Sequence, residues 1–337
     1  MILKDRIKPG TNGASKFGWH FYSEFDECET KGAFHQIFPH PDGGEGLEPV
    51  EKSSALLVGI EAHRGIEIWY ASGWKDGQYK LDEALDAVAE QHREHSGEYR
   101  YEKDAADGLG TSLAVLTRYH NFYGPDSPVP EYPEIQVAAS AEGEPLLEQN
   151  LEMPLNNGAT FTGRLDGVMW YRGKLCPHEF KTSVVSWANR TADRLAVDPQ
   201  CIGQRCLLKH NFPDLPIGPV IASVGVKNPG EKKSTVPHVV RKFHGHSEGT
   251  MEKFQRDLAR RAKRLSALVT GFDDQLDNGN SPWDALDETF DRTPTGDRCI
   301  GNFSCDYLPI CSLWTQGADE KLLTTAVRQG YRARSLV

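Results

Sequence analysis

Two alternating segments joined by a short turn constrain the fold of this chain most strongly. Residues 159–171 read ATFTGRLDGVMWY, and residues 175–183 read LCPHEFKTS. Apolar and polar residues in alternation, with threonine and aromatic side chains, are typical of β-strands. The link Arg172–Lys174 is long enough only for a turn, and Pro177 is expected to break the second strand near its start. The sequence therefore predicts a two-stranded hairpin.

The hairpin carries two carboxylates and a lysine. Glu179 and Lys181 are two residues apart, so a strand places both on one face, and Phe180 then points into the core. Asp166 on the neighbouring strand can approach the same face. Asp166 and Glu179 suit Mg²⁺ or Mn²⁺, which prefer oxygen ligands, and the Phe180 carbonyl offers a third ligand. Lys181 can orient an attacking water or stabilise a phosphate transition state. The alternative is a surface hairpin with an ion pair worth less than about 1 kcal/mol.

A helical pattern precedes the hairpin. Residues 56–67 (LLVGIEAHRGIE) have the apolar periodicity of a helix. His63 and Glu67 are four residues apart and share one face. A neutral imidazole at His63 can join the metal site, although a histidine on a helix is more often a packed or solvated residue.

A second helical pattern follows the hairpin. Asp198 is expected to cap a helix whose first residue is Pro199. Gln200 and Gln204 then share one face of this helix, and an amide near a metal can donate to a phosphate or orient a ligand. The alternative is a solvated pair of glutamines.

Together these residues resemble the RecB-like branch of the PD-(D/E)XK nuclease superfamily. The matching positions, in the family's order, are Gly59, His63, Ile66 and Glu67 in the G-x-x-x-H helix, Gly163 and Asp166 in the G-x-x-D strand, Glu179, Lys181 and Thr182 in the E-x-K-T strand, and Gln200 in the Q-x-x-x-Y helix. The chain departs from the family at Gln204, where tyrosine is usual. Four ordered elements between about residues 20 and 311 are far more specific than the hairpin alone.

The resemblance implies an α/β fold, with a restriction-endonuclease-like core in which helices flank a central mixed sheet. It implies catalytic roles for His63, Asp166, Glu179, Lys181 and Gln200, and metal ligation by the first three of these with the Phe180 carbonyl. Glu148 resembles a glutamate on the strand before the aspartate strand and is a further candidate ligand. The implied activity is hydrolysis of phosphodiester bonds in DNA, as an exonuclease in recombination or DNA processing.

Two alternatives stay open for the function. The chain can be a catalytically silent DNA-binding or scaffold protein of the same fold, or a metal-dependent hydrolase of another phosphodiester. The expected partner is DNA with a free end. No G-x-x-x-x-G-K-[ST] phosphate loop occurs, so any helicase or recombination partner is a separate chain.

Cysteines flank both ends of the region that resembles the nucleases. Cys28 precedes the histidine helix, and Cys299, Cys305 and Cys311 follow the core. Four thiolates suit a [4Fe–4S] cluster or a tetrahedral zinc ion, and the third possibility is that no metal binds. In AddB-type and CRISPR-associated relatives such a cluster joins the two ends of the domain, which the same order implies here. Those relatives often carry a tight C-x-x-C pair, whereas the wider spacing in this chain looks like phage-encoded members.

The remaining organisation follows from shorter patterns. We expect one nuclease domain over residues 1–337, with a helical insertion at 78–122, a cluster subdomain formed by 20–35 with 290–315, and a basic tail at 316–337. A loop is expected at 37–54, and strands at 218–227 and 235–243. Residues 247–270 read as a long helix. The candidate DNA contacts are Gln204, Lys232 and Lys233, together with Arg256, Arg260 and Lys263, which form a basic stripe on that helix; a solvated face is the alternative for the stripe.

The overall charge and hydropathy limit the class of protein. The formal net charge of -10 argues against a general nucleic-acid coat, but it permits an enzyme that concentrates basic groups locally. No apolar run approaches the roughly 18 residues that a membrane span needs. We therefore expect a cytoplasmic protein, in the host cytoplasm if the chain is phage-encoded, with no membrane partner.

Overall fold

A computed structural model describes residues 18–99, 101–126, 134–227, 239–291, 299 and 305–334. The chain folds into two compact units. The first contains Met1–Glu51, Pro154–Thr162 and Gln255–Val337, and the second contains Lys52–Met153 and Gly163–Phe254. The sequence predicts one nuclease domain with a terminal subdomain. That both units belong to one nuclease stays a prediction.

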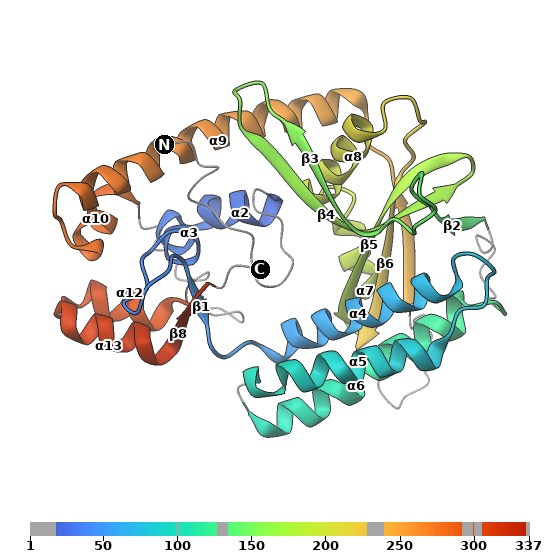
Figure 1. The fold of residues 1–337 in the computed structure, drawn as a ribbon, viewed down its shortest axis with the longest axis horizontal. Helices are drawn as coiled ribbons and strands as arrows, with labels where there is room; N and C mark the ends of the chain where they lie inside the picture. The colour runs from blue at the N-terminus through green and yellow to red at the C-terminus, as the bar shows by residue number, and fades with distance from the viewer. Residues whose placement is uncertain are drawn as a thin grey trace. The chain divides into compact units, whose positions relative to one another are not determined.

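A six-stranded mixed sheet forms the centre of the second unit (Figure 1). Its strands are β2 (Ile135–Val137), β3 (Leu147–Pro154), β4 (Thr160–Tyr171), β5 (Lys174–Val184), β6 (Val220–Lys227) and β7 (Val239–His244). The order is β2-β4-β5-β6-β7, and β3 also pairs with β4. The β5–β6 pair is parallel, whereas β4–β5 and β6–β7 are antiparallel. The predicted mixed sheet with flanking helices is therefore confirmed.

Helices cover both faces of this sheet. On one face lie α4 (Ser54–Gly73), α5 (Leu81–His95) and α6 (Glu102–Tyr123), and on the other α7 (Ala188–Arg194) and α8 (Pro199–Asn211). Strand alternation divides the core between the two faces. Phe180 and Ile221 pack with α4 and α6, whereas Ala222 packs with α8 and Val224 with α7. Glu179 and Lys181 are out of phase with Phe180, which directs them to the α8 face.

The β4–β5 hairpin has the predicted turn. Arg172 and Gly173 both have positive φ, 50° and 72°, as a two-residue primed turn requires. The strand that follows is continuous, because Pro177 pairs with Val168 inside the ladder. The expected break at Pro177 is thus wrong.

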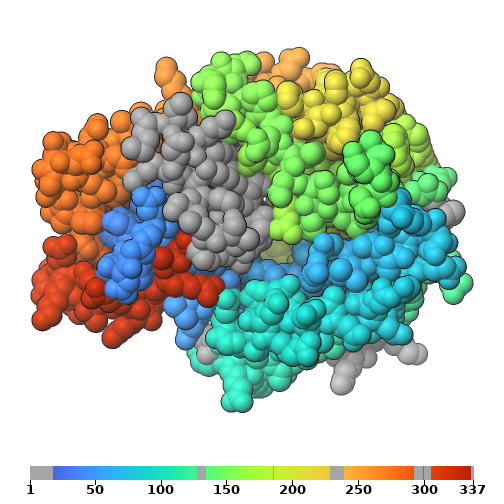
Figure 2. Space-filling view, in the orientation of Figure 1, coloured from blue at the N-terminus to red at the C-terminus, as the bar shows by residue number. Residues whose placement is uncertain are grey.

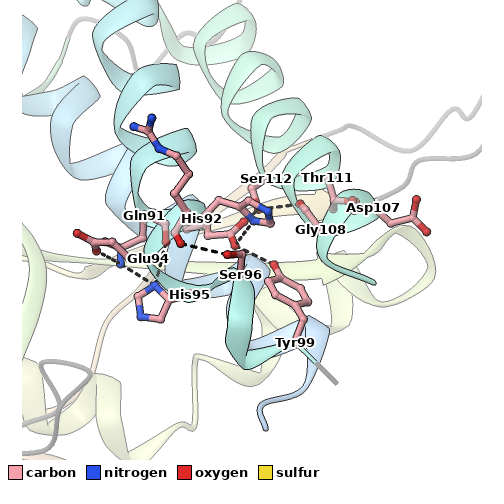
Figure 3. Close-up of polar contacts among 12 residues, drawn as sticks. Gln91, His92, Glu94, His95, Ser96, Tyr99, Asp107, Gly108, Thr111 and Ser112 are labelled. Carbon is pink, nitrogen blue, oxygen red and sulfur yellow. Dashed lines mark hydrogen bonds and ion pairs between the residues drawn. The ribbon is translucent and has the colours of Figure 1, made fainter. Parts of the chain in front are cut away.

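The helical section predicted at 78–122 consists of α5, the short helix η1 (Ser96–Glu98) and α6. In the space-filling view it forms an outer surface of the second unit (Figure 2). Its polar side chains meet at Glu61 of α4, which is 0% exposed. The Glu61 carboxylate accepts hydrogen bonds from the Tyr99 and Ser112 hydroxyls at 2.8 and 2.6 Å, and His92 Nδ1 lies 2.9 Å away. Figure 3 shows His92, Tyr99 and Ser112 converging from α5, the link and α6. A buried carboxylate with three such partners fixes α4 against the section.

The first unit is mainly helical. It contains α2 (Trp19–Glu27), α3 (Glu29–Gln36), most of α9 (Glu248–Asp277), α10 (Pro282–Thr289), α12 (Leu308–Thr315) and α13 (Glu320–Gly330), with β1 (Leu47–Pro49) paired antiparallel to β8 (Tyr331–Ala333). Aromatic side chains form its core, where the Phe34 ring packs against Phe38, Trp283 and Tyr307.

Two expectations for this unit need correction. The loop expected at 37–54 contains β1, and the tail expected at 316–337 contains α13 and β8. The tail is folded because Leu323 and Val327 bury one face of α13 and β8 completes a strand pair with β1. Across the described residues, no helix combines the length and the apolar character that a membrane crossing requires.

Candidate metal centre

The candidate site lies where β4 and β5 separate. Their paired ladder extends to Gly167 opposite His178. Asp166, the residue before, turns its carboxylate toward β5, and the Phe180 amide donates to Asp166 Oδ2 at 2.6 Å. One carboxylate oxygen is therefore held by backbone, which fixes the direction of the other.

The flanking helices are positioned by packing at small residues and by a cap. Gly163 of β4 has no space for a side chain, because a Cβ atom there would collide with Leu207 of α8. Asp198 accepts from the Gln200 amide at 2.8 Å and Pro199 is the first helical residue, so the predicted cap of α8 is confirmed. On the other side of the sheet, the His63 ring of α4 packs edge-on against Phe180 with 5.1 Å between ring centroids.

Three side chains from three elements converge at Asp166. One ligand atom from each of His63, Glu148 and Asp166 lies within 4.8 Å of the other two. His63 Nδ1 is 3.5 Å from Asp166 Oδ1. Two carboxylates and one imidazole at this spacing form a donor set for a divalent cation, and two oxygen donors with one nitrogen suit Mn²⁺ better than an all-oxygen set would.

Glu148 has the unusual backbone of this group. Its φ is 50°, in the left-handed region that a glutamate rarely adopts. Such strain costs about 1–3 kcal/mol and persists where the surrounding structure enforces it. Its carboxylate also lies 2.5 Å from Arg164 Nε. Arg164 was not predicted as a site residue, although its position two residues before Asp166 on β4 places both on one strand face.

The pKa values of Glu148, Asp166 and His63 are all shifted by burial and by one another's charges. Burial raises the pKa of Glu148 to about 7, and the negative charge of Asp166 adds to the shift. Burial alone would also raise the pKa of Asp166, but His63 and Lys181 lower it to about 2. Burial opposes protonation of His63, yet the adjacent Asp166 carboxylate raises the pKa of the imidazole above its usual value. In the absence of a metal ion, protons on His63 and Glu148 reduce the repulsion between the two carboxylates. A bound cation would supply this positive charge instead.

Glu179 and Lys181 form the adjoining half of the site. Glu179 is 0% exposed, pairs with Lys181, and accepts from Gln200 Nε2 at 3.0 Å and from Gln204 Nε2. Burial raises the pKa of Glu179. Burial alone would lower the pKa of Lys181, but Glu179 and Asp166 raise it above its usual value, so the lysine stays charged. Lys181 Nζ also lies 3.5 Å from Gln200 Oε1.

The structure thus brings together most of the site residues that the sequence indicates. His63, Asp166 and Glu148 form the three-ligand group, while Glu179 is held by Lys181 and the two glutamines. Gln204, predicted as a DNA contact at the position where the chain departs from the family, is buried and donates to Glu179. Ligation by Glu179 and by the Phe180 carbonyl stays a prediction.

The four candidate cluster cysteines all belong to the first unit. The Cys305 amide donates to the Cys299 carbonyl at 3.2 Å, and burial raises the pKa of the Cys305 thiol, to which Cys28 and Cys299 also contribute. Among the described residues no three cysteine sulfurs lie within 4.8 Å of one another. Sulfurs around one zinc ion would be about 3.8 Å apart, so a preformed zinc site is not present in the described part of the chain.

Three of the candidate DNA contacts outside the site are exposed on α9. Arg256, Arg260 and Lys263 lie on the solvent side of α9 in the first unit, and Arg260 pairs with Asp257. Lys232 and Lys233 lie outside the described residues. A phosphate-binding role for all five stays a prediction.

Comparison with known proteins adds little to this geometry. No protein-family model and no curated protein matches the chain. Among solved structures, the chain is similar to one described as "Crystal structure of SSO0001", with 14% identity over 63% of this chain and 76% of that chain, and a TM-score of 0.24. A similarity of this size carries no argument about fold or function.

Proposed function

We propose that this chain is a divalent-metal-dependent DNA nuclease of the PD-(D/E)XK type, and that it removes nucleotides from DNA ends as RecB-like relatives do. The observation that carries the proposal is the convergence of His63, Glu148 and Asp166 within 4.8 Å, beside the paired Glu179 and Lys181. Neither half alone is specific, but nuclease chemistry needs both: a cation site and a fixed positive charge next to it.

The donor set fits a hard divalent cation. The Asp166 oxygen that the Phe180 amide does not occupy, one Glu148 oxygen and an imidazole nitrogen of His63 would hold the ion. When bound, a Mg²⁺ or Mn²⁺ ion polarises the scissile phosphate and acidifies an attacking water. The imidazole nitrogen favours Mn²⁺ over Mg²⁺ as the more effective ion.

The protein residues perform the remaining steps. Lys181 keeps its proton and can donate it in a hydrogen bond to the developing negative charge on the phosphate or orient the attacking water. Gln200 links Lys181 to Glu179, so the lysine is held in one orientation. Glu179 is held in turn by Nε2 of Gln204, while the Gln204 amide oxygen is buried and has no hydrogen-bond partner among the described residues.

The experiment that tests the proposal is cleavage of end-labelled linear and circular DNA, single- and double-stranded, with Mg²⁺, Mn²⁺ or chelator. We expect metal-dependent loss of label from linear DNA, faster with Mn²⁺. Lys181→Ala should lower the rate by roughly 10²–10³-fold, the range for removal of a transition-state donor. The matched control is Lys174→Ala, which removes a lysine at the exposed start of the same strand.

Two outcomes contradict the proposal. Tight DNA binding without cleavage by any metal would favour a silent scaffold, and cleavage that survives Lys181→Ala would remove the assigned site. Cleavage of circular DNA at the rate of linear DNA would replace the exonuclease mode by an endonuclease mode.

We also propose that Cys28, Cys299, Cys305 and Cys311 hold a [4Fe–4S] cluster, with structural zinc as the alternative. The support is that the Cys305 amide donates to the Cys299 carbonyl at 3.2 Å, and that Cys28 is close enough to the Cys305 thiol to add to the rise in its pKa that burial causes. A four-iron cluster holds its cysteine sulfurs farther apart than one zinc ion does. Protein purified without oxygen should be brown and contain iron, and Cys305→Ala should lose both while Asp166→Ala keeps both. Colourless wild-type protein without iron would contradict the cluster.

A further inference from the structure

The short helix between β5 and α8 carries an exposed aromatic side chain and two arginines. Trp187 ends η2 (Val185–Trp187) just before α7, and its side chain is 47% exposed. The Arg190 guanidinium lies over the Trp187 ring at 4.7 Å from the ring centre. Arg194 follows one turn later and is also exposed. We call Trp187, Arg190 and Arg194 the α7 stripe, because positions three and four residues apart share one helix face.

The path of the chain holds the α7 stripe next to the candidate site. The chain leaves the site at Lys181 on β5 and returns to it at Gln200 on α8, and the two side chains lie 3.5 Å apart. The α7 helix lies between these two points along the chain and packs on β6 and β7 (Figure 1). It also contacts β5, where the Ser183 hydroxyl, two residues after Lys181, lies 3.1 Å from the Thr191 hydroxyl of α7.

The helix is rigidly attached through its opposite face. Ala188 and Ala192 are 0% exposed and pack against Val224, Val226 and Val240 of the sheet. The acidic residue of α7, Asp193, is paired with Lys242. Because Asp193 pairs with Lys242, it does not pair with Arg190 or Arg194 of its own helix.

Among the residues that the structure describes, no carboxylate forms an ion pair with Arg190 or Arg194, and no second ring contacts Trp187. The link that follows adds Val197, which is 75% exposed. An exposed tryptophan flanked by two unpaired cations has the composition of a surface on which bases stack while phosphates meet arginines. A solvated helix face explains the arginines but leaves the exposed tryptophan and valine unexplained.

We propose that the α7 stripe binds single-stranded DNA next to the scissile phosphate, with a base stacked on Trp187 and phosphates bound by Arg190 and Arg194. This inference rests on the proposed nuclease function and specifies its substrate. Single-stranded DNA is the class that fits, because the bases of a duplex are already stacked and cannot offer a free face to the indole. The stripe spans about 10 Å along the helix, so one bound strand can meet its ring and both guanidinium groups.

The test compares binding and cleavage of a labelled oligothymidine, a blunt duplex and a duplex with a single-stranded end. Binding is measured by fluorescence anisotropy in the Asp166→Asn background without divalent metal, so that hydrolysis does not interfere. Trp187→Ala should weaken binding of the oligothymidine roughly thirtyfold, which corresponds to the middle of the range of about 1–3 kcal/mol for loss of one stacking side chain. Trp187→Phe should recover most of the affinity. The control is Tyr101→Ala, which removes an aromatic side chain that is 63% exposed on the helical section.

The arginines give a second readout that a structural role would not change. Each of Arg190→Ala and Arg194→Ala should reduce the slope of log affinity against log salt by about 0.7, the value for one phosphate contact on a single strand. The blunt duplex should be affected by none of these changes.

Failure of the inference and failure of the proposed function are separable. If Trp187→Ala binds and cleaves the oligothymidine as the unsubstituted chain does, the stripe is not a DNA surface, and the nuclease proposal stands. If the chain cleaves no DNA but loses oligothymidine binding on Trp187→Ala, the stripe stands as a binding site and the nuclease proposal fails. Equal weakening by Trp187→Ala and Tyr101→Ala would also overturn the inference, because the effect would not be local to α7.

Discussion

Helix α4 borders two clusters of polar side chains that differ in how well their charges are satisfied. Glu61 is fully buried and has three side-chain partners of its own, Tyr99, His92 and Ser112. Two residues along the same helix, His63 contacts Asp166, which shares its surroundings with the Glu148 carboxylate. The Glu61 cluster has one carboxylate with a donor for each oxygen, whereas the Asp166 cluster has two carboxylates whose charges repel, which adds to burial in raising the pKa of Glu148.

The difference separates a group that holds the fold from a group that can bind a ligand. A satisfied buried carboxylate stabilises its neighbours and has no free lone pair directed at a cation. Crowded carboxylates destabilise the metal-free protein, and the left-handed backbone of Glu148 adds strain. A cation relieves the repulsion. Substitutions at Asp166 should therefore act mainly on activity, and substitutions at Glu61 mainly on stability.

The largest expected effect is on cleavage by Asp166→Asn. The asparagine can still accept from the Phe180 amide, so the fold should be retained, but a neutral amide is a poor ligand for Mn²⁺. We expect the rate of DNA cleavage to fall by at least about a thousandfold. The melting temperature without metal should fall modestly at neutral pH, because the lowered pKa of Asp166 means that its charged form stabilises the folded state. Rates and thermal unfolding of the same preparations test this. If Asp166→Asn is inactive because it is unfolded, then Asp166 holds the fold as Glu61 does, and the distinction between the two clusters is wrong.

The second largest effect is expected on the stability of the Glu61→Ala variant. Three buried partners lose their acceptor, and we expect the free energy of unfolding to fall by about 3 kcal/mol. Glu61→Gln keeps one carbonyl acceptor and should cost less. Denaturant unfolding measures both, and cleavage per folded molecule should change less than about threefold. A large loss of cleavage in fully folded Glu61→Gln would mean that the two clusters are coupled.

A smaller effect concerns pH and Glu148. The pKa of this carboxyl is about 7 in the folded chain against an ordinary 4.5, mainly because of burial. The folded state binds the proton more tightly, so this contribution to stability is complete below about pH 4.5 and is lost as the pH rises through 7. Without metal, Glu148→Gln should therefore be more stable than the unsubstituted chain by about 1–2 kcal/mol near pH 8 and equal to it near pH 4. Chelator-treated samples unfolded at several pH values test the sign, and a difference that grows toward acid would contradict it.

The smallest effect is expected for the exposed basic residues of α9. Arg260 is already paired with Asp257, and Arg256 and Lys263 are exposed. Replacing Arg256, Arg260 and Lys263 together by alanine should change DNA affinity by less than about threefold, as for a solvated face. A salt slope reduced by about 2 or more would instead assign the stripe on α9 to phosphate binding.

Local patterns were enough for part of the site. Glu179, Lys181 and Asp166 follow from strand alternation and one two-residue turn, and the cap at Asp198 follows from the residue types alone. Glu148 stayed a further candidate, because its position depends on a left-handed backbone that the sequence does not reveal. The Glu61 cluster was missed for another reason. Its partners lie 31, 38 and 51 residues away along the chain, and their meeting depends on how three helices pack.

The same limit applies to the fold. Periodic segments predicted individual strands and helices, and the resemblance implied their arrangement as a mixed sheet flanked by helices, which is confirmed. The pairing of β1 with β8 was not, because each strand has three residues and they meet only after the chain between them has folded. Packing also decides why Gly163 is required, since its neighbour Leu207 lies on another element.

Mn²⁺ binding, followed by electron paramagnetic resonance or calorimetric titration, tests the central claim most directly. The unsubstituted chain should bind a Mn²⁺ ion tightly, Asp166→Asn should lose this binding, and Glu61→Gln should keep it. Binding of Mn²⁺ that is equal in all three proteins, or absent from the unsubstituted chain, would contradict the assignment of His63, Glu148 and Asp166 as a metal centre.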